Sequence, residues 1–164
     1  MEIGESFVGE GADAAHVNTV LGPRSGPVGT AWTTALATPS AGHTPFIAVV
    51  RPGLPAKPMT LFVNKAAIAS DTHANLTWGA AQAGVASGVA DAVADGVIPP
   101  AEVDELVLIA AIWVDPAAKD AEAVYRNNRA ATRAALAAGH ANQPKLDQVL
   151  EARATPRNPF FTPR

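Results

Sequence analysis

Three polar side chains stand where apolar ones would be expected in this sequence, and their chemistry is that of proton transfer. They are His16, Lys65 and Gln82. An imidazole titrates near neutral pH and can both take up and release a proton. A lysine held in a cleft has a lowered pKa, and a buried carboxamide must hydrogen-bond to the backbone, to water or to a ligand. We therefore expect a site for a small polar molecule if the fold brings these residues together.

His16 lies in an alternating segment that predicts a strand over residues 14–21. Because side chains alternate along a strand, His16, Asn18 and Val20 share one face of it. A histidine and an amide on one surface could line a site. An exposed strand face, or a core histidine with a satisfied hydrogen bond, explains the same pattern without one.

Lys65 and Gln82 interrupt two further apolar patterns. Lys65 has apolar neighbours on its face of a predicted strand over residues 60–68, where its ammonium could also simply reach water. Gln82 interrupts the apolar stripe of a predicted helix over residues 71–95, and hydrogen bonding to the backbone is the ordinary alternative for its carboxamide. The stripe consists of Trp78, Gln82, Val85, Val89 and Val93.

The elements that would position these residues alternate between strands and helices. The predicted strands are residues 14–21, 43–50, 60–68 and 106–114, and the predicted helices are 30–38, 71–95 and 115–138, the last begun by Asp115-Pro116. The order β-α-β-β-α-β-α predicts the α/β class, as a two-layer α/β sandwich. Residues 1–140 should form a single domain and residues 141–164 its extended C-terminal arm, with Phe160-Phe161 packed on a neighbouring subunit or folded back.

The composition argues against several classes of function. A net charge of -3 without a basic run argues against a nucleic-acid partner. With no cysteine and no His-x-x-x-His spacing, neither thiolate chemistry nor a metal site is expected. No segment has the roughly 18 apolar residues of a membrane span, and the acidic N-terminal segment does not resemble a signal peptide. We expect a cytoplasmic protein that acts on a small molecule, with no membrane partner.

Several motifs resemble the formaldehyde-activating enzyme family. They are residues 4–11 (GESFVGEG), 15–18 (AHVN), 22–24 (GPR), 54–58 (LPAKP), 61–65 (LFVNK), 79–86 (GAAQAGVA), 92–99 (AVADGVIP) and 158–160 (NPF). Each motif is weak alone, but together they keep one register over nearly the whole chain.

The resemblance implies a fold, a reaction and a set of site residues. The family fold is a two-layer α/β domain like the second domain of ribosomal protein S5, and it assembles as a homopentamer with sites between subunits. The family condenses formaldehyde with tetrahydromethanopterin, giving methylene-tetrahydromethanopterin and water, and no metal or redox cofactor is needed. The resemblance makes His16 the catalytic acid, which protonates the departing hydroxyl, and places Ile47, Lys65 and Gln82 at the pterin site.

Two residues depart from the family pattern. Asn18 stands where the family has aspartate and Ala67 where it has threonine, both on ligand-facing sides of their strands. The first change removes a charge that could stabilise a cationic intermediate, and the second removes a hydrogen-bonding hydroxyl. Condensation of formaldehyde with a different amine substrate is therefore an alternative. So are a non-catalytic formaldehyde or pterin sensor and a structural oligomer whose site is inactive.

Overall fold

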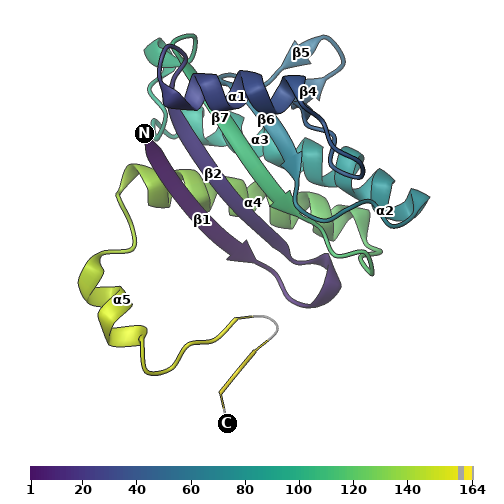
Figure 1. Ribbon diagram of the computed structural model, residues 1–164, viewed down its shortest axis with the longest axis vertical. Coiled ribbons are helices and arrows are strands. Elements are labelled where there is room, and N and C mark those ends of the chain that lie inside the picture. Colours follow the sequence, from purple (N-terminus) through teal and green to yellow (C-terminus); the bar gives the residue numbers. More distant parts are fainter. Residues whose placement is uncertain (159–160, 164) are drawn as a thin grey trace.

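The computed structural model describes residues 1–158 and 161–163. Phe160, one of the two phenylalanines expected to pack on a neighbouring subunit or fold back, lies outside these ranges. Its centre is a five-stranded sheet in the order β1-β2-β7-β6-β3 (Figure 1). The strands of the sheet are β1 (Glu2–Val8), β2 (Ala15–Pro23), β3 (Phe46–Ile47), β6 (Met59–Asn64) and β7 (Leu106–Trp113). A two-stranded ribbon of β4 (Val49–Arg51) and β5 (Leu54–Pro55) lies beside it. The predicted α/β class is confirmed.

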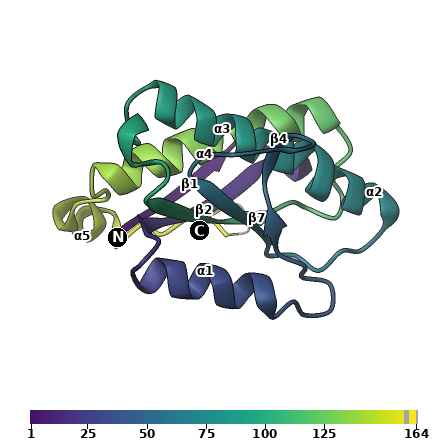
Figure 2. The same ribbon diagram turned by 90° about the horizontal axis from the view of Figure 1, so that it is seen from above.

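Helices lie on both faces of the sheet. They are α1 (Pro27–Ala37), α2 (Asp71–Asn75), a π-helical turn (Leu76–Ala81), α3 (Gln82–Ala94), α4 (Ala121–His140) and α5 (Leu146–Ala152), with short 3₁₀ turns at Gly11–Asp13 and Pro100–Glu102. Figure 2 shows α3 and α4 on one side of the sheet and α1 on the other. Within the described residues, no helix combines the length and hydropathy that crossing a bilayer requires.

The main core lies between the sheet and helices α3 and α4, and alternate side chains of each strand point into it. On β2, Val17 and Leu21 are buried in this core, and on β7 the buried residues Leu108 and Ile112 join them. Because the side-chain period of a strand is two, the intervening residues of both strands must point to the opposite face.

Helix α1 covers only one end of that opposite face. Its Val28 and Trp32 pack against Leu61 of β6 and Val107 of β7, which makes a second, smaller apolar cluster. These contacts involve the beginning of β6 and β7 and the end of β2. The other end of the face, where β2 begins and β7 ends, is left without a covering helix (Figure 1).

Strand β1 was not predicted from the sequence, although it is a full partner in the sheet. It runs antiparallel to β2 from Glu2↔Leu21 to Val8↔Ala15. The predicted strand over residues 43–50 is also wrong in part, because it divides into β3 and β4 at the buried Ala48. β6 stops at Asn64, short of the predicted end at residue 68.

The predicted helix over residues 71–95 is present, but its middle is a π-helical turn. A π turn contains more residues than an α turn, so it shifts the phase of every side chain before it relative to those after it. Trp78 therefore leaves the predicted stripe and is 43% exposed, whereas Gln82, Val85 and Val89 are buried as expected.

Two helix boundaries near the C-terminus differ from the prediction. Asp115 does not cap α4; its Oδ1 accepts from Ala117 N–H in a tight turn, and Asp120 is the cap instead. The arm after α4 leads away from the body at α5 (Figure 1), and its Arg157 and Asn158 lie beside Glu5 and His16 of the sheet. It is not extended throughout, because α5 interrupts it. Every residue of α5 is exposed. The proposed boundary between the domain and its arm stays a prediction.

Helices α3 and α4 approach closely because α3 presents a glycine to α4. A Cβ atom on Gly88 would lie 2.6 Å from the backbone oxygen of Arg129 and 2.8 Å from Thr132 Cβ. Both distances are shorter than van der Waals contact, and one involves backbone, which cannot rotate away.

Gly88→Ala should therefore destabilise the protein by about 1–3 kcal/mol through overpacking, measured as the free energy of unfolding in urea. Gly79→Ala is the matched control, because nothing lies within 4 Å of a Cβ at that position. Equal unfolding free energies for the two variants would contradict this account of the interface.

Candidate active site

The uncovered end of the sheet collects polar and aromatic side chains from adjacent strands. The antiparallel register places Phe7 of β1 beside His16 of β2, and His16 beside Trp113 of β7. Glu5 is paired with Asn18 two residues along the same strands, and therefore on the same face of the sheet. All five residues lie on the face opposite α3 and α4, so the pleat of the sheet itself aligns them.

Lys65 reaches this surface from the end of β6. Its backbone N–H donates to Ile112 O at 2.7 Å, which extends the parallel pairing of β6 and β7 by one residue. Alternation therefore continues through Lys65, on the side of Leu61 and Val63. Its Nζ donates to Asn18 Oδ1 at 2.7 Å and lies 3.4 Å from His16 Nδ1.

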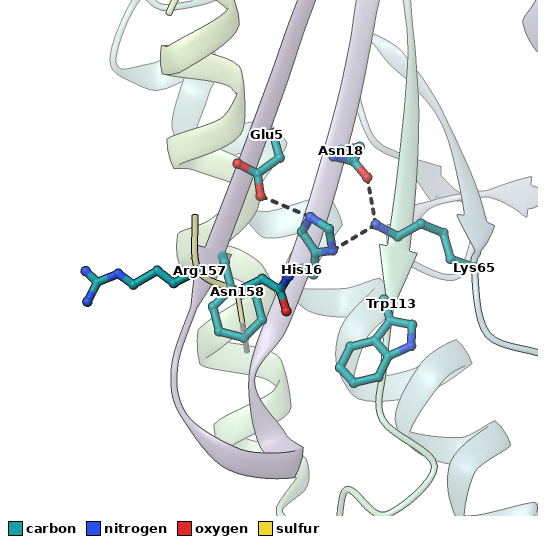
Figure 3. A pocket seen from close by; sticks show the side chains of 8 residues that line it. Glu5, His16, Asn18, Lys65, Trp113, Arg157 and Asn158 are labelled. Carbon is teal, nitrogen blue, oxygen red and sulfur yellow. Dashed lines mark hydrogen bonds and ion pairs between the residues drawn. The ribbon is translucent and has the colours of Figure 1, made fainter. Parts of the chain in front are cut away.

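His16 lies between a carboxylate and an ammonium (Figure 3). Its Nε2 is 3.0 Å from Glu5 Oε1, and its Nδ1 faces Lys65 Nζ. A carboxylate can only accept and an ammonium can only donate. The neutral imidazole that satisfies both neighbours carries its hydrogen on Nε2 and keeps a lone pair on Nδ1.

Burial lowers the pKa of His16 below its ordinary value, and the positive charge of Lys65 lowers it further, while Glu5 acts in the opposite direction. Burial also lowers the pKa of Lys65, again opposed by Glu5. In both residues, partial burial disfavours the charged form and so lowers the pKa. His16 is therefore poised as a neutral base near neutral pH, next to a lysine that releases its proton more readily than a free one.

A cavity of about 650 Å³ opens over these residues. Its lining residues are Glu5, Phe7, His16, Asn18, Lys65, Trp113, Arg157 and Asn158. The volume is that of ordinary small-molecule sites. Phe7 and Trp113 provide apolar walls for a flat ring, and Arg157 comes from the C-terminal arm with its guanidinium directed away from His16 (Figure 3).

The structure brings together some of the predicted site residues but not all of them. His16, Asn18 and Lys65 line the cavity. Gln82 does not; it is buried on α3, at the opposite face of the sheet, where its Oε1 accepts from Val49 N–H at 2.6 Å.

The remaining two predicted residues also lie away from the cavity of this chain. Ile47 pairs with Leu61 at the edge of the sheet and packs on the cluster under α1. Ala67 lies beyond β6, in contact range of Gly42. The roles of Ile47, Ala67 and Gln82 at a pterin site stay predictions.

Five residues that line the cavity were missed as site residues in the sequence: Glu5, Phe7, Trp113, Arg157 and Asn158. Glu5 and Phe7 carried a usable signal, because IGESFV alternates between apolar or small residues and larger ones as a strand does. Trp113 ends the apolar run of β7 and could not be told from a core residue. Arg157 has no local pattern that points to a site.

No group of three or more His, Asp or Glu side chains gathers as a metal site would require in residues 1–158 and 161–163. Of these potential metal-binding side chains, the described lining of the cavity contains one imidazole, His16, and one carboxylate, Glu5. The prediction that the reaction uses no metal or redox cofactor stays a prediction. What the arrangement offers is proton transfer beside two aromatic walls.

Comparisons with known proteins point to one family over most of the chain. The profile of a family described as "Formaldehyde-activating enzyme (Fae)" matches residues 3–161. A "5,6,7,8-tetrahydromethanopterin hydro-lyase" of Methanosarcina barkeri is 40% identical over 158 residues, which are 96% of this chain and 89% of that protein. A "Bifunctional enzyme Fae/Hps" of Methanosarcina mazei is 42% identical over 150 residues, and one of Archaeoglobus fulgidus is 42% identical over 158. The chain spans 38% and 40% of the length of these two bifunctional proteins.

Replacing Lys65 by methionine should raise the pKa of His16, because the variant loses the nearby positive charge that disfavours an imidazolium. An NMR titration of the histidine ring protons would measure the shift. Lys57→Met is the control, since Lys57 pairs with Asp104 and lies outside the cavity. An unchanged or lowered His16 midpoint in Lys65→Met would show that the two groups are not coupled.

Proposed function

This chain belongs to the formaldehyde-activating enzyme family, and from that membership we propose that it condenses formaldehyde with tetrahydromethanopterin, giving methylene-tetrahydromethanopterin and water. One structural observation carries the proposal. His16 and Lys65 face each other across 3.4 Å in a cavity with aromatic walls, and each has a lowered pKa. That pair can move the protons that this condensation requires.

The reaction needs two amine protons to leave with the carbonyl oxygen as water. One substrate nitrogen adds to the carbon of formaldehyde; neutral His16 takes its proton and passes it to the oxygen, which becomes a hydroxyl. Lys65 supplies the second proton, through His16, and the C–O bond breaks to release water and leave an iminium. The second nitrogen then closes on the iminium carbon and returns its proton to Lys65.

This course refines the role expected of His16. A histidine with a lowered pKa is a poor acid at rest, so it must first gain a proton before it can protonate the departing hydroxyl. Most of the acceleration would still come from holding both reactants over the same surface. The aromatic walls formed by Phe7 and Trp113 suit a pterin ring.

The two departures from the family pattern are compatible with this reaction. Asn18 keeps an oxygen acceptor for Lys65 Nζ at 2.7 Å, so the ammonium remains positioned without a carboxylate. Without that negative charge, the pKa of Lys65 stays lowered, which helps it to release a proton. Ala67 does not line the cavity of this chain. The relatives with about 40% identity favour the family reaction over condensation with another amine.

We expect the complete site to combine residues of two copies of this chain in a homo-oligomer. Gln82 and His16 lie on opposite faces of one sheet, so one chain cannot bring both to one ligand. Exposed apolar side chains suggest where copies could meet: Ile3 on β1 and Leu146, Val149 and Leu150 on α5. The pentameric state and the cytoplasmic location stay predictions.

Wild-type protein should accelerate the condensation above its spontaneous rate, and His16→Gln should lower kcat by about 10²–10⁴-fold, as loss of a general acid–base does. The measurement is consumption of formaldehyde with tetrahydromethanopterin, corrected for the uncatalysed reaction. His140→Gln is the matched control, because His140 also pairs with a glutamate, Glu2, but lies outside the cavity.

Three results would contradict this function in different ways. Acceleration with tetrahydrofolate or another amine, but not with tetrahydromethanopterin, would support the different-substrate alternative. Binding without acceleration would support a sensor. Equal rates for His16→Gln and wild type would remove His16 from the mechanism.

Mixing two inactive variants tests whether the site is shared between copies. His16→Gln and Gln82→Ala should each lose activity alone, and joint refolding in equal amounts should restore about one quarter of the wild-type sites by random assembly. Each restored site would take His16 from one copy and Gln82 from its neighbour. No recovery in mixed oligomers, verified by separate tags on the two variants, would place the complete site within one chain.

A further inference from the structure

Among the described residues, Glu5 is the one carboxylate that lines the cavity, and the mechanism above does not use it. We propose that Glu5 is a positioning residue for His16: it accepts the Nε2–H hydrogen bond and so leaves Nδ1 as the nitrogen that exchanges protons. This inference rests on the proposed function for its catalytic meaning. Its structural content, the tautomer and orientation of one imidazole, can be measured without any substrate.

The position of Glu5 is set by the fold and not by a flexible loop. β1 is paired with β2 along its whole length, with Glu5 opposite Asn18. On the other face of β1, Gly4 packs so closely on α4 that a Cβ there would lie 1.8 Å from Ala135 O. Only glycine fits at that point, so β1 cannot turn over, and Glu5 must face the cavity.

The geometry leaves Nε2 occupied and Nδ1 available. Nε2 is 3.0 Å from Glu5 Oε1, an ordinary N–H···O hydrogen-bond distance. Nδ1 faces Lys65 Nζ at 3.4 Å, a looser contact that a substrate nitrogen could replace. A histidine whose second nitrogen donates to a carboxylate has a fixed tautomer and ring orientation, as in the catalytic triads of unrelated hydrolases.

The charges around His16 give Glu5 a second effect. In the part of the chain that the structure describes, the cationic residues lining the cavity are Lys65, which follows β6, and Arg157 of the arm, and Glu5 is the anionic one. Glu5 raises the pKa of His16 against the larger lowering effect of burial. Removing the carboxylate should therefore move the His16 titration to lower pH and should also weaken the preference for one tautomer.

The same strand offers a matched control. Glu2 also lies on β1 and also contacts a histidine, its Oε1 being 3.3 Å from His140 Nδ1, but this pair is outside the cavity. Glu2→Ala therefore removes an equivalent surface charge and ion pair from the same edge strand. A general effect on β1 would appear in both variants, whereas positioning of His16 would appear in only one.

The experiment compares wild type, Glu5→Ala, Glu5→Gln and Glu2→Ala by ¹⁵N NMR of the histidine rings, with the His16 signals identified by their absence in His16→Gln. We expect His16 of wild type to be in the Nε2–H form when neutral. Glu5→Ala should lower the His16 midpoint and weaken the preference for the Nε2–H form, which then depends only on the looser 3.4 Å contact of Nδ1 with Lys65 Nζ. Glu5→Gln, which keeps an oxygen acceptor, should lower the midpoint but preserve the tautomer, and Glu2→Ala should change neither.

Kinetics supply the second readout. Glu5→Ala should lower kcat about tenfold or more with little change in KM, and Glu5→Gln should recover part of that loss. An unchanged His16 tautomer and titration in Glu5→Ala, or a kcat equal to wild type, would overturn the positioning role. If wild type shows no condensation activity, the proposed function fails, while the NMR comparison still decides whether Glu5 orients His16.

Discussion

The alternation of strand β2 between a dry core and an open surface is the constraint on which the site depends. Val17 and Leu21 are buried under α3 and α4, and that burial holds the register of the strand. A slip of one residue would expose these side chains and force His16 and Asn18 into the core, where a buried polar group without partners is costly. The apolar face of β2 thus fixes the position of its polar face.

The extent of α1 determines which part of this sheet face is open to a ligand. Under α1 the opposite face of the sheet is apolar, whereas beyond it His16 and Lys65 are only partly buried. This intermediate burial is enough to lower the pKa of both groups and still leaves them open to a ligand. Complete burial would need stronger partners than Asn18 and Glu5, and complete exposure would leave each group with ordinary solution chemistry.

Much of the fold and part of the site could be predicted from the sequence, and the failures have physical reasons. His16 and Lys65 were found because each breaks an apolar period. Gln82 broke a period too, yet its partner in this chain is a backbone N–H, the ordinary alternative. A core histidine with satisfied hydrogen bonds does exist, but it is His73, held by Ala69 N–H and Val114 O. Strand β1 was missed because its alternation is between small and larger side chains and not between polar and apolar ones, and Glu5 was missed with it.

The most direct test of the central claim, that a neutral His16 accepts the first proton, is the pH dependence of kcat/KM. Its acid limb reports the essential base of the free enzyme. The account predicts that this limb has a midpoint below the ordinary histidine value of about 6.5 and coincides with the His16 midpoint measured by NMR titration. A rate that rises as the pH falls through the His16 midpoint would contradict it, because the imidazolium would then be the active form.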